Sequence, residues 1–125
     1  MKLPIFKAFQ VSEISEKKFE SEIIERDIND LPAGDVLIKV CYSSINYKDA
    51  LSATGNKGVT RQYPHTPGID AAGVVIASTS EDFQEGEEVI VSGYDLGMNT
   101  AGGFGQVIRV PVGWVVSCPK GIRNA

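Results

Sequence analysis

Residues 34–53 read GDVLIKVCYSSINYKDALSA and connect the clearest strand pattern of the chain to its one helical pattern. Apolar side chains recur at every second position from Val36 to Tyr42, which predicts a β-strand with these residues on one face. Further short apolar runs occur on both sides of this stretch, so the strand is expected to be one of several.

The polar residues after this strand predict a short helix over residues 46–53. Asn46 is a favoured N-cap, Asp49 falls at the third helical position, where a carboxylate meets free backbone amides, and Gly55 can take the left-handed conformation after the last turn. The start of a helix also offers N–H groups and short polar side chains to a ligand. This junction is therefore either a capped helix with Tyr47 packed nearby or a ligand site.

Six other runs of β-favouring residues lie before and after this stretch. They cover residues 6–11, 19–26, 70–77, 88–92, 104–110 and 114–117. The run 70–77 is small and apolar on both faces, which is typical of a strand packed within a crowded core. Short strands separated by loops rich in glycine and proline predict a mainly β fold, either a barrel or a sandwich. The polar segment 54–68 is expected to be a mobile surface loop.

The composition predicts one soluble globular domain, because the chain has 125 residues, of which 42% are hydrophobic and 22% are charged. The 16 acidic and 12 basic residues give a net charge of -4, which argues against binding to nucleic acid or to an anionic membrane. No uncharged run reaches the ~20 residues of a membrane-spanning helix, and the apolar run 71–80 is about half that length. Since the first residues carry no export signal, a cytoplasmic protein is expected.

The cysteines, the histidine and the acidic residues form no sequence motif of a metal, disulfide or catalytic site. Cys41 and Cys118 are far apart and form no CxxC pair, so they are expected to be small buried hydrophobes rather than metal ligands or disulfide partners. His65 is the single histidine, and a loop role is expected for it. The acidic run 81–88 is interpreted as a solvated turn that enters a strand. Residues 103–108 lack the third glycine and the helix of a dinucleotide-binding fingerprint.

Five short motifs occur in an order that resembles the GroES-like catalytic domain of the medium-chain dehydrogenases/reductases. They are GDVLIKV at 34–40, SINYKDAL at 44–51, PGIDAAGVV at 67–75, GEEV at 86–89 and GGFGQ at 102–106. The second block and the PGID tetrapeptide resemble more narrowly the YhdH/YhfP type of quinone oxidoreductase, which includes the acryloyl-CoA reductases. The resemblance covers essentially the whole chain and implies a partly open GroES-like barrel with a short helix.

The resemblance also implies a branch of this superfamily without zinc. Its zinc-dependent alcohol dehydrogenases have a cysteine where Asn46 stands and a His-Glu pair where Ile69 and Asp70 stand. An amide and an isoleucine cannot replace a thiolate and an imidazole as zinc ligands. The four closely spaced cysteines that hold structural zinc in those relatives are missing as well, so no metal is expected.

The activity that the resemblance implies is hydride transfer from NADPH to a quinone or to an activated double bond such as that of acrylyl-CoA. By resemblance, Tyr47 contacts NADP near its nicotinamide and offers an aromatic wall and a hydroxyl. Asn46 is expected to donate an amide hydrogen bond to the cofactor ribose or to a substrate carbonyl. Asp49 is expected to cap the helix or to orient its neighbours. The candidate catalytic residues are therefore Asn46, Tyr47 and Asp49, and the candidate cofactor contacts are Tyr47 and Asn46.

Residues 1–125 are accordingly expected to be the catalytic domain of a longer two-domain enzyme, because a separate Rossmann domain binds most of the dinucleotide in this superfamily. The expected partner is a small electrophilic substrate, and the full-length enzyme is expected to be a homodimer. The 125 residues alone are expected to have little or no reductase activity. The alternative is a GroES-like binding or assembly module without chemistry, although such a barrel gives no reason for the polar residues 46–49 at this junction.

Overall fold

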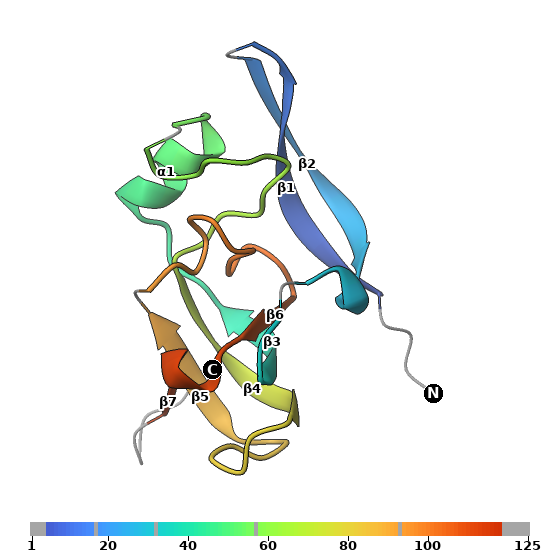
Figure 1. Ribbon diagram of the computed structural model, residues 1–125, viewed down its shortest axis with the longest axis vertical. Coiled ribbons are helices and arrows are strands. Elements are labelled where there is room, and N and C mark those ends of the chain that lie inside the picture. The colour runs from blue at the N-terminus through green and yellow to red at the C-terminus, as the bar shows by residue number, and fades with distance from the viewer. Residues whose placement is uncertain (1–4, 17, 32, 57, 93, 119–125) are drawn as a thin grey trace.

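The computed structural model describes residues 5–16, 18–31, 33–56, 58–92 and 94–118 (Figure 1). The elements in chain order are β1 (Ile5–Ser15), β2 (Lys18–Asp27), η1 (Ile28–Asp30), β3 (Val36–Tyr42), α1 (Tyr47–Ala53), β4 (Asp70–Ser78), β5 (Glu88–Ser92), β6 (Val107–Val110), η2 (Val112–Trp114) and β7 (Val115–Ser117). The mainly β fold with one short helix is thus confirmed. Within the described residues, no helix is long and apolar enough to cross a membrane.

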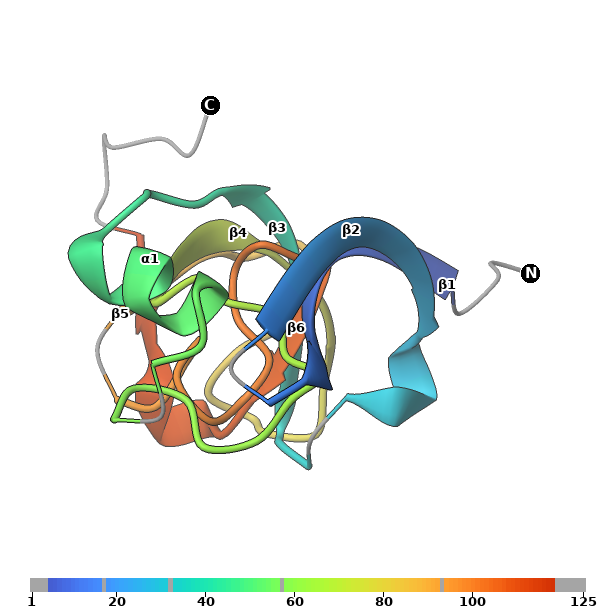
Figure 2. The ribbon, with the colours of Figure 1, turned by 90° about the horizontal axis from the view of Figure 1, so that it is seen from above.

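The larger sheet has five antiparallel strands in the order β6-β3-β4-β5-β7. Its two outer strands, β6 and β7, follow each other in the chain and are joined only by residues 111–114. Because most of this connection is the 3-10 turn η2, which rises about 2 Å per residue, it is far shorter than the roughly 19 Å width of a flat five-stranded sheet. The sheet must therefore curl until its outer strands approach each other, which gives the expected partly open barrel (Figure 2).

The main core lies inside this curled sheet and is built mostly from residues that alternate along its strands, together with two loop residues, Phe83 and Leu96. It contains Val36, Ile38, Ala71, Val75, Phe83, Val89, Val91, Leu96, Ile108, Val110 and Val115. The alternation predicted for β3 holds at Val36 and Ile38, which are 0% and 1% exposed. The pairing register then shifts between Val40 and Tyr42, and Tyr42 is 51% exposed. This shift turns the end of β3 out of the core.

β1 and β2 form a separate two-stranded ribbon that extends past α1 (Figure 1). Backbone hydrogen bonds attach β1 to the barrel loops, because Val11 and His65 exchange two of them (2.8 and 2.9 Å) and Phe9 donates one to the carbonyl of Phe104 (3.0 Å). The ring of Phe19 in β2 meets that of Tyr63 edge-on, with centroids 4.8 Å apart. Most of β2 is exposed, whereas β1 buries Phe6, Ala8 and Val11.

Several local predictions are wrong. Cys41 is exposed, because it lies at the end of β3 where the register shifts, while Cys118 is half-buried. The segment 54–68 is not simply a surface loop, since Val59 and Thr60 are buried and the Thr60 hydroxyl lies 2.6 Å from that of a buried serine in α1. The expected strand 104–110 begins only at residue 107, after a turn rich in glycine.

Candidate functional site

The helix α1 begins as the sequence predicts, with Asn46 as its N-cap in an extended conformation. The N–H of Asn46 donates to Oδ2 of Asp49 at the third helical position (2.9 Å). Gly55 follows the last turn with a φ of +92°, which favours glycine. The predicted cap, carboxylate and glycine are therefore all in place, and the strand-to-helix junction has a defined geometry.

Asp49 is 1% exposed, and its two carboxylate oxygens hold different segments. Oδ2 accepts the N–H of Asn46, whereas Oδ1 accepts the N–H groups of Gly68 (3.1 Å) and Ile69 (2.9 Å). Hydrogen bonds to a charged acceptor are among the stronger ones in proteins. Asp49 thus fixes the residues before β4 against the start of α1.

The side chain of Asn46 lies against Asp70, the first residue of β4. Its Nδ2 donates to Oδ2 of Asp70 (3.2 Å) and to Oγ of Ser44 (2.9 Å), and it lies 3.4 Å from Oδ2 of Asp49. Asp70 also accepts hydrogen bonds from the hydroxyls of Ser44 (2.9 Å) and Ser92 (2.7 Å). We call these five residues, Ser44, Asn46, Asp49, Asp70 and Ser92, the junction cluster.

The sheet register brings the junction cluster together, because Asp70 pairs with Ser92 across β4 and β5, and the end of β3 pairs with β4 beside them. Gly68 lets the chain approach closely here: its φ is +117°, and a Cβ atom would lie 2.5 Å from the backbone nitrogen of Gly103. The sequence predicted Asn46 and Asp49 but missed Ser44 and Ser92 as cluster members. Pairing the predicted strands 70–77 and 88–92 at their ends would have placed Asp70 opposite Ser92.

Ser44, Asp70 and Ser92 of the junction cluster line a groove of about 370 Å³, which we call the site groove. Its walls include Tyr42, Ser44, Asp70, Ala72, Ile90 and Ser92. Mostly apolar walls around a few convergent polar groups are typical of a small-molecule site. The chemistry that this arrangement offers is hydrogen bonding from a fixed amide and hydroxyls, beside a carboxylate.

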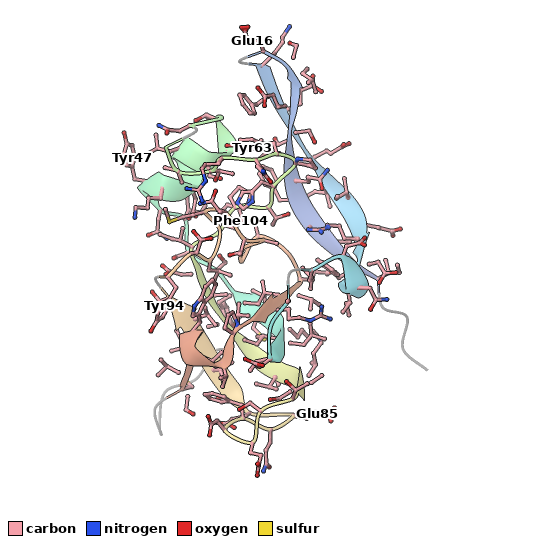
Figure 3. All side chains as sticks on the ribbon, viewed as in Figure 1. Glu16, Tyr47, Tyr63, Glu85, Tyr94 and Phe104 are labelled. Atoms are coloured by element: carbon pink, nitrogen blue, oxygen red, sulfur yellow. The ribbon has the colours of Figure 1, made fainter. Side chains whose placement is uncertain are left out.

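Tyr47 is 79% exposed and projects outward from the first turn of α1 (Figure 3). The helix is capped as the first of the two interpretations of this junction expected, but Tyr47 does not pack against its neighbours. Its ring and hydroxyl are available to a ligand, and the role predicted for Tyr47 stays a prediction.

His65 is 7% exposed and ties β1 to the barrel loops. Its Nε2 lies 2.7 Å from the carbonyl oxygen of Gly97, and since a carbonyl can only accept, this nitrogen carries the proton. Desolvation by burial lowers the pKa of His65 from its ordinary value of 6.5. A neutral, buried imidazole bonded to backbone fits the loop role expected from the sequence.

Among the described residues, no group of three or more histidine, cysteine, aspartate or glutamate side chains is placed to hold a metal ion. Where the resemblance places the cysteine and the His-Glu pair of the zinc-dependent relatives, this chain has Asn46, Ile69 and Asp70, and the Asn46 amide donates a hydrogen bond to the Asp70 carboxylate. This donor set suits a hydrogen-bonding site better than a tetrahedral zinc site, which takes thiolate and imidazole ligands.

The curled barrel and the polar junction between β3 and α1 define the class of this domain. The chain belongs to the alcohol dehydrogenase GroES-like domain family, whose sequence profile matches residues 32–120. It is 37% identical over 119 residues to the acrylyl-CoA reductase AcuI of Ruegeria pomeroyi. The aligned residues cover 94% of this chain and 36% of AcuI. It is 46% identical over 93 residues to YhfP of Bacillus subtilis, which is named as a quinone oxidoreductase on a provisional basis. The aligned residues cover 74% of this chain and 28% of YhfP.

Solved structures give the same result. The YhdH oxidoreductase from Salmonella enterica, in complex with NADP, matches with a TM-score of 0.89 and 39% identity over 94% of this chain and 36% of its own. B. subtilis YhfP with NAD bound matches with a TM-score of 0.90 and 38% identity over 96% of this chain and 36% of its own. The resemblance to this type of protein is confirmed, and the chain spans 36% or less of the length of these relatives.

Proposed function

We propose that these residues act as the catalytic domain of an NADPH-dependent, zinc-independent oxidoreductase that transfers hydride to a quinone or to an activated C=C bond such as that of acrylyl-CoA. The observation that carries the proposal is the junction cluster, where the Asn46 amide and the Asp70 carboxylate are hydrogen-bonded beside an open groove. The similarity to the acrylyl-CoA reductase AcuI and to the NADP complex of YhdH supports it. A second domain of a longer protein would bind most of the dinucleotide.

The chemistry calls for stabilisation of charge on the acceptor. NADPH, when bound, supplies the hydride. When hydride adds to a double bond conjugated with a carbonyl group, negative charge develops on the carbonyl oxygen until a proton reaches the neighbouring carbon. The Asn46 amide is proposed to donate to that oxygen in exchange for one of the two hydrogen bonds that its Nδ2 makes to Ser44 and Asp70, while the other bond keeps the amide in place. A donor held near the reacting group stabilises the charge that develops in the transition state.

Tyr47 and Asp49 have different proposed roles at this site. Tyr47 is exposed beside the junction cluster and is proposed to contact the nicotinamide end of the cofactor. Asp49 is buried and proposed to act as a positioning residue, because all of its contacts hold backbone or the Asn46 side chain. A cytoplasmic location and a homodimer of the longer protein stay predictions.

The Tyr47→Phe and Tyr47→Ala variants test the proposal in a longer, two-domain form of the protein. Tyr47→Ala is expected to weaken NADPH affinity and turnover, whereas Tyr47→Phe keeps the aromatic contact and loses only the contribution of the hydroxyl. The matched control is Tyr94→Ala, since Tyr94 is also exposed but stacks on Trp114. If both Tyr47 variants kept wild-type affinity and turnover, the assigned contact would be wrong. Absence of NADPH consumption with quinones and conjugated thioesters alike would reject the function.

A further inference from the structure

The strand β2 has one side on which no further strand of the described residues pairs. It is joined to β1 alone in the two-stranded ribbon, whereas β1 bonds to the barrel loops on its other side (Figure 1). We call the outer side of β2 the ribbon edge. Most residues of β2 are exposed. An exposed strand edge offers N–H and C=O groups to a strand of another chain.

The hydrogen bonds of β1 show which residues of β2 point their backbone groups to the ribbon edge. On its barrel side, β1 uses the backbone of Lys7, Phe9 and Val11. Since successive residues of a strand point their N–H and C=O groups to opposite sides, the even-numbered residues of β1 bond to β2. The ribbon register pairs them with the even-numbered residues of β2. The outward backbone groups of β2 therefore include those of Ser21, Ile23 and Glu25.

This direction of the backbone groups restricts how two copies of β2 can pair. In an antiparallel pair about a two-fold axis, the numbers of two facing residues have a constant sum. The outward groups belong to odd-numbered residues in both copies, so odd-numbered residues must face each other for hydrogen bonds to form. The sum is therefore even, and the axis passes through a residue rather than between two residues.

Most positions of the axis near the middle of β2 set like charges opposite each other. An axis at Glu22 or at Glu25 sets that glutamate against the same residue of the second copy. An axis at Ser21 sets Glu20 against Glu22. Like charges directly opposite each other destabilise a sheet, so these three registers are disfavoured.

Two positions of the axis set opposite charges against each other instead. An axis at Ile23 sets Glu20 of each copy against Arg26 of the other, and an axis at Ile24 sets Glu22 against Arg26. Within the described residues, Arg26 has no carboxylate partner, because its one hydrogen bond goes from Nη2 to the carbonyl oxygen of Asp30 (3.1 Å). The guanidinium thus has further donors for a glutamate of a second copy.

The axis at Ile23 makes the better pair of the two. It pairs residues 19–27 of each copy, whereas the axis at Ile24 pairs only residues 21–27. It also sets Ile23, which is 66% exposed, against Ile23 of the second copy. The other register sets Ile23 against Glu25 and joins the Ile24 side chains, which are already half-buried. Covering the more exposed apolar side chain gives the larger gain.

We propose that the ribbon edge is a surface for self-association, along which β2 pairs antiparallel with β2 of a second copy of this chain about a two-fold axis at Ile23. The two ribbons then form one four-stranded sheet, with Glu20 facing Arg26 on both sides of the axis. Because the surface is narrow and the ion pairs lie at the molecular surface, the association is expected to be weak and to depend on concentration. The inference is independent of the proposed reductase function.

Hydrogen exchange measured by NMR on the 125-residue chain tests which backbone groups pair. The amides of Ser21, Ile23 and Glu25 are expected to exchange more slowly at millimolar than at micromolar concentration, since the second copy then accepts their hydrogen bonds. The amides of Glu22 and Ile24 bond to β1 in the single chain as well, so they serve as the internal reference and are expected to change much less.

Charge variants followed by sedimentation velocity test the register. Glu20→Arg and Arg26→Glu each set like charges against each other on both sides of the axis, and each is expected to weaken self-association about tenfold or more. An equal mixture of the two variants restores both opposite-charge pairs and is expected to associate about as tightly as the wild-type chain. A loss of folding in either variant would not give this rescue.

A further pair of variants tests the apolar contact on the axis. Ile23→Lys sets two lysines against each other and is expected to weaken self-association about tenfold or more. The matched control is Ile14→Lys, because Ile14 is an exposed isoleucine of β1 away from the ribbon edge, and it is expected to leave self-association unchanged.

Three results would overturn the inference. The first is a chain that sediments as a monomer at millimolar concentration. The second is a dimer in which the amides of Ser21, Ile23 and Glu25 exchange as fast as in the monomer, because the copies then meet on another surface. The third is a mixture of Glu20→Arg and Arg26→Glu that associates no better than either variant alone.

Discussion

Replacing Asp49 tests the architecture of the junction cluster, because its buried carboxylate accepts hydrogen bonds on both oxygens. In Asp49→Asn one oxygen becomes an NH₂ group, which cannot accept, so either the N–H of Asn46 or those of Gly68 and Ile69 lose their acceptor. Hydrogen bonds to charged groups contribute about 1.5–3 kcal/mol, and a buried donor without a partner costs about 1–3 kcal/mol. We expect a loss of about 3 kcal/mol, or about 10 °C in Tm.

Thermal unfolding followed by circular dichroism measures this effect. The control is Asp82→Asn, which removes the same charge from an exposed turn and is expected to stay within about 0.5 kcal/mol of wild type. If Asp49→Asn melted within about 2 °C of the wild-type chain, the two-sided acceptor role of Asp49 would be refuted.

Two further predictions concern the backbone and the single histidine. Gly68→Ala places a Cβ atom 2.5 Å from a backbone nitrogen and is expected to be far more destabilising than the control Gly86→Ala. At Gly86 φ is +93°, but no atom lies within 4 Å, so only about 1–2 kcal/mol of backbone strain arises. Equal decreases in Tm for the two variants would contradict this. The unfolded chain takes up a proton at the ordinary pKa of His65, about 6.5, whereas burial lowers the folded pKa. Stability should therefore fall as the pH drops below about 6.5, and His65→Gln should flatten the dependence of Tm on pH between about 5 and 7. If the plot of Tm against pH had the same slope in the His65→Gln variant, the pH dependence of stability would come from other groups.

Much of the fold could be predicted because its signals are local. The alternation at Val36 and Ile38 and the capping residues Asn46 and Asp49 each depend on near neighbours in the chain. Cys41 was misplaced because a register shift at the end of β3 depends on how β4 pairs with it. Burial in the segment 54–68 could not be predicted either, since it arises partly from packing against β1, far away in sequence.

The candidate site was predicted in part for the same reason. Asn46 and Asp49 are adjacent to the helix start, so their positions follow from the sequence. The contacts of Asp70 with Ser44 and Ser92 join β4, β5 and the segment after β3, and only the sheet register shows that these residues meet. The resemblance places Asp70 where the zinc-dependent relatives have the glutamate of a His-Glu pair, and the structure adds that Asp70 accepts a hydrogen bond from the Asn46 amide.

The central claim is that this domain supports hydride transfer from NADPH with the Asn46 amide as the oriented donor. The most direct measurement follows deuterium from NADPH that carries deuterium at both hydrogens of C4 of its nicotinamide ring, in a longer, two-domain form of the protein, with acrylyl-CoA or a quinone supplied. One of the two deuterium atoms is predicted to leave the cofactor as the acceptor is reduced, and Asn46→Leu is predicted to slow this by about a hundredfold. Retention of both deuterium atoms on the cofactor, or wild-type transfer by Asn46→Leu, would contradict the claim.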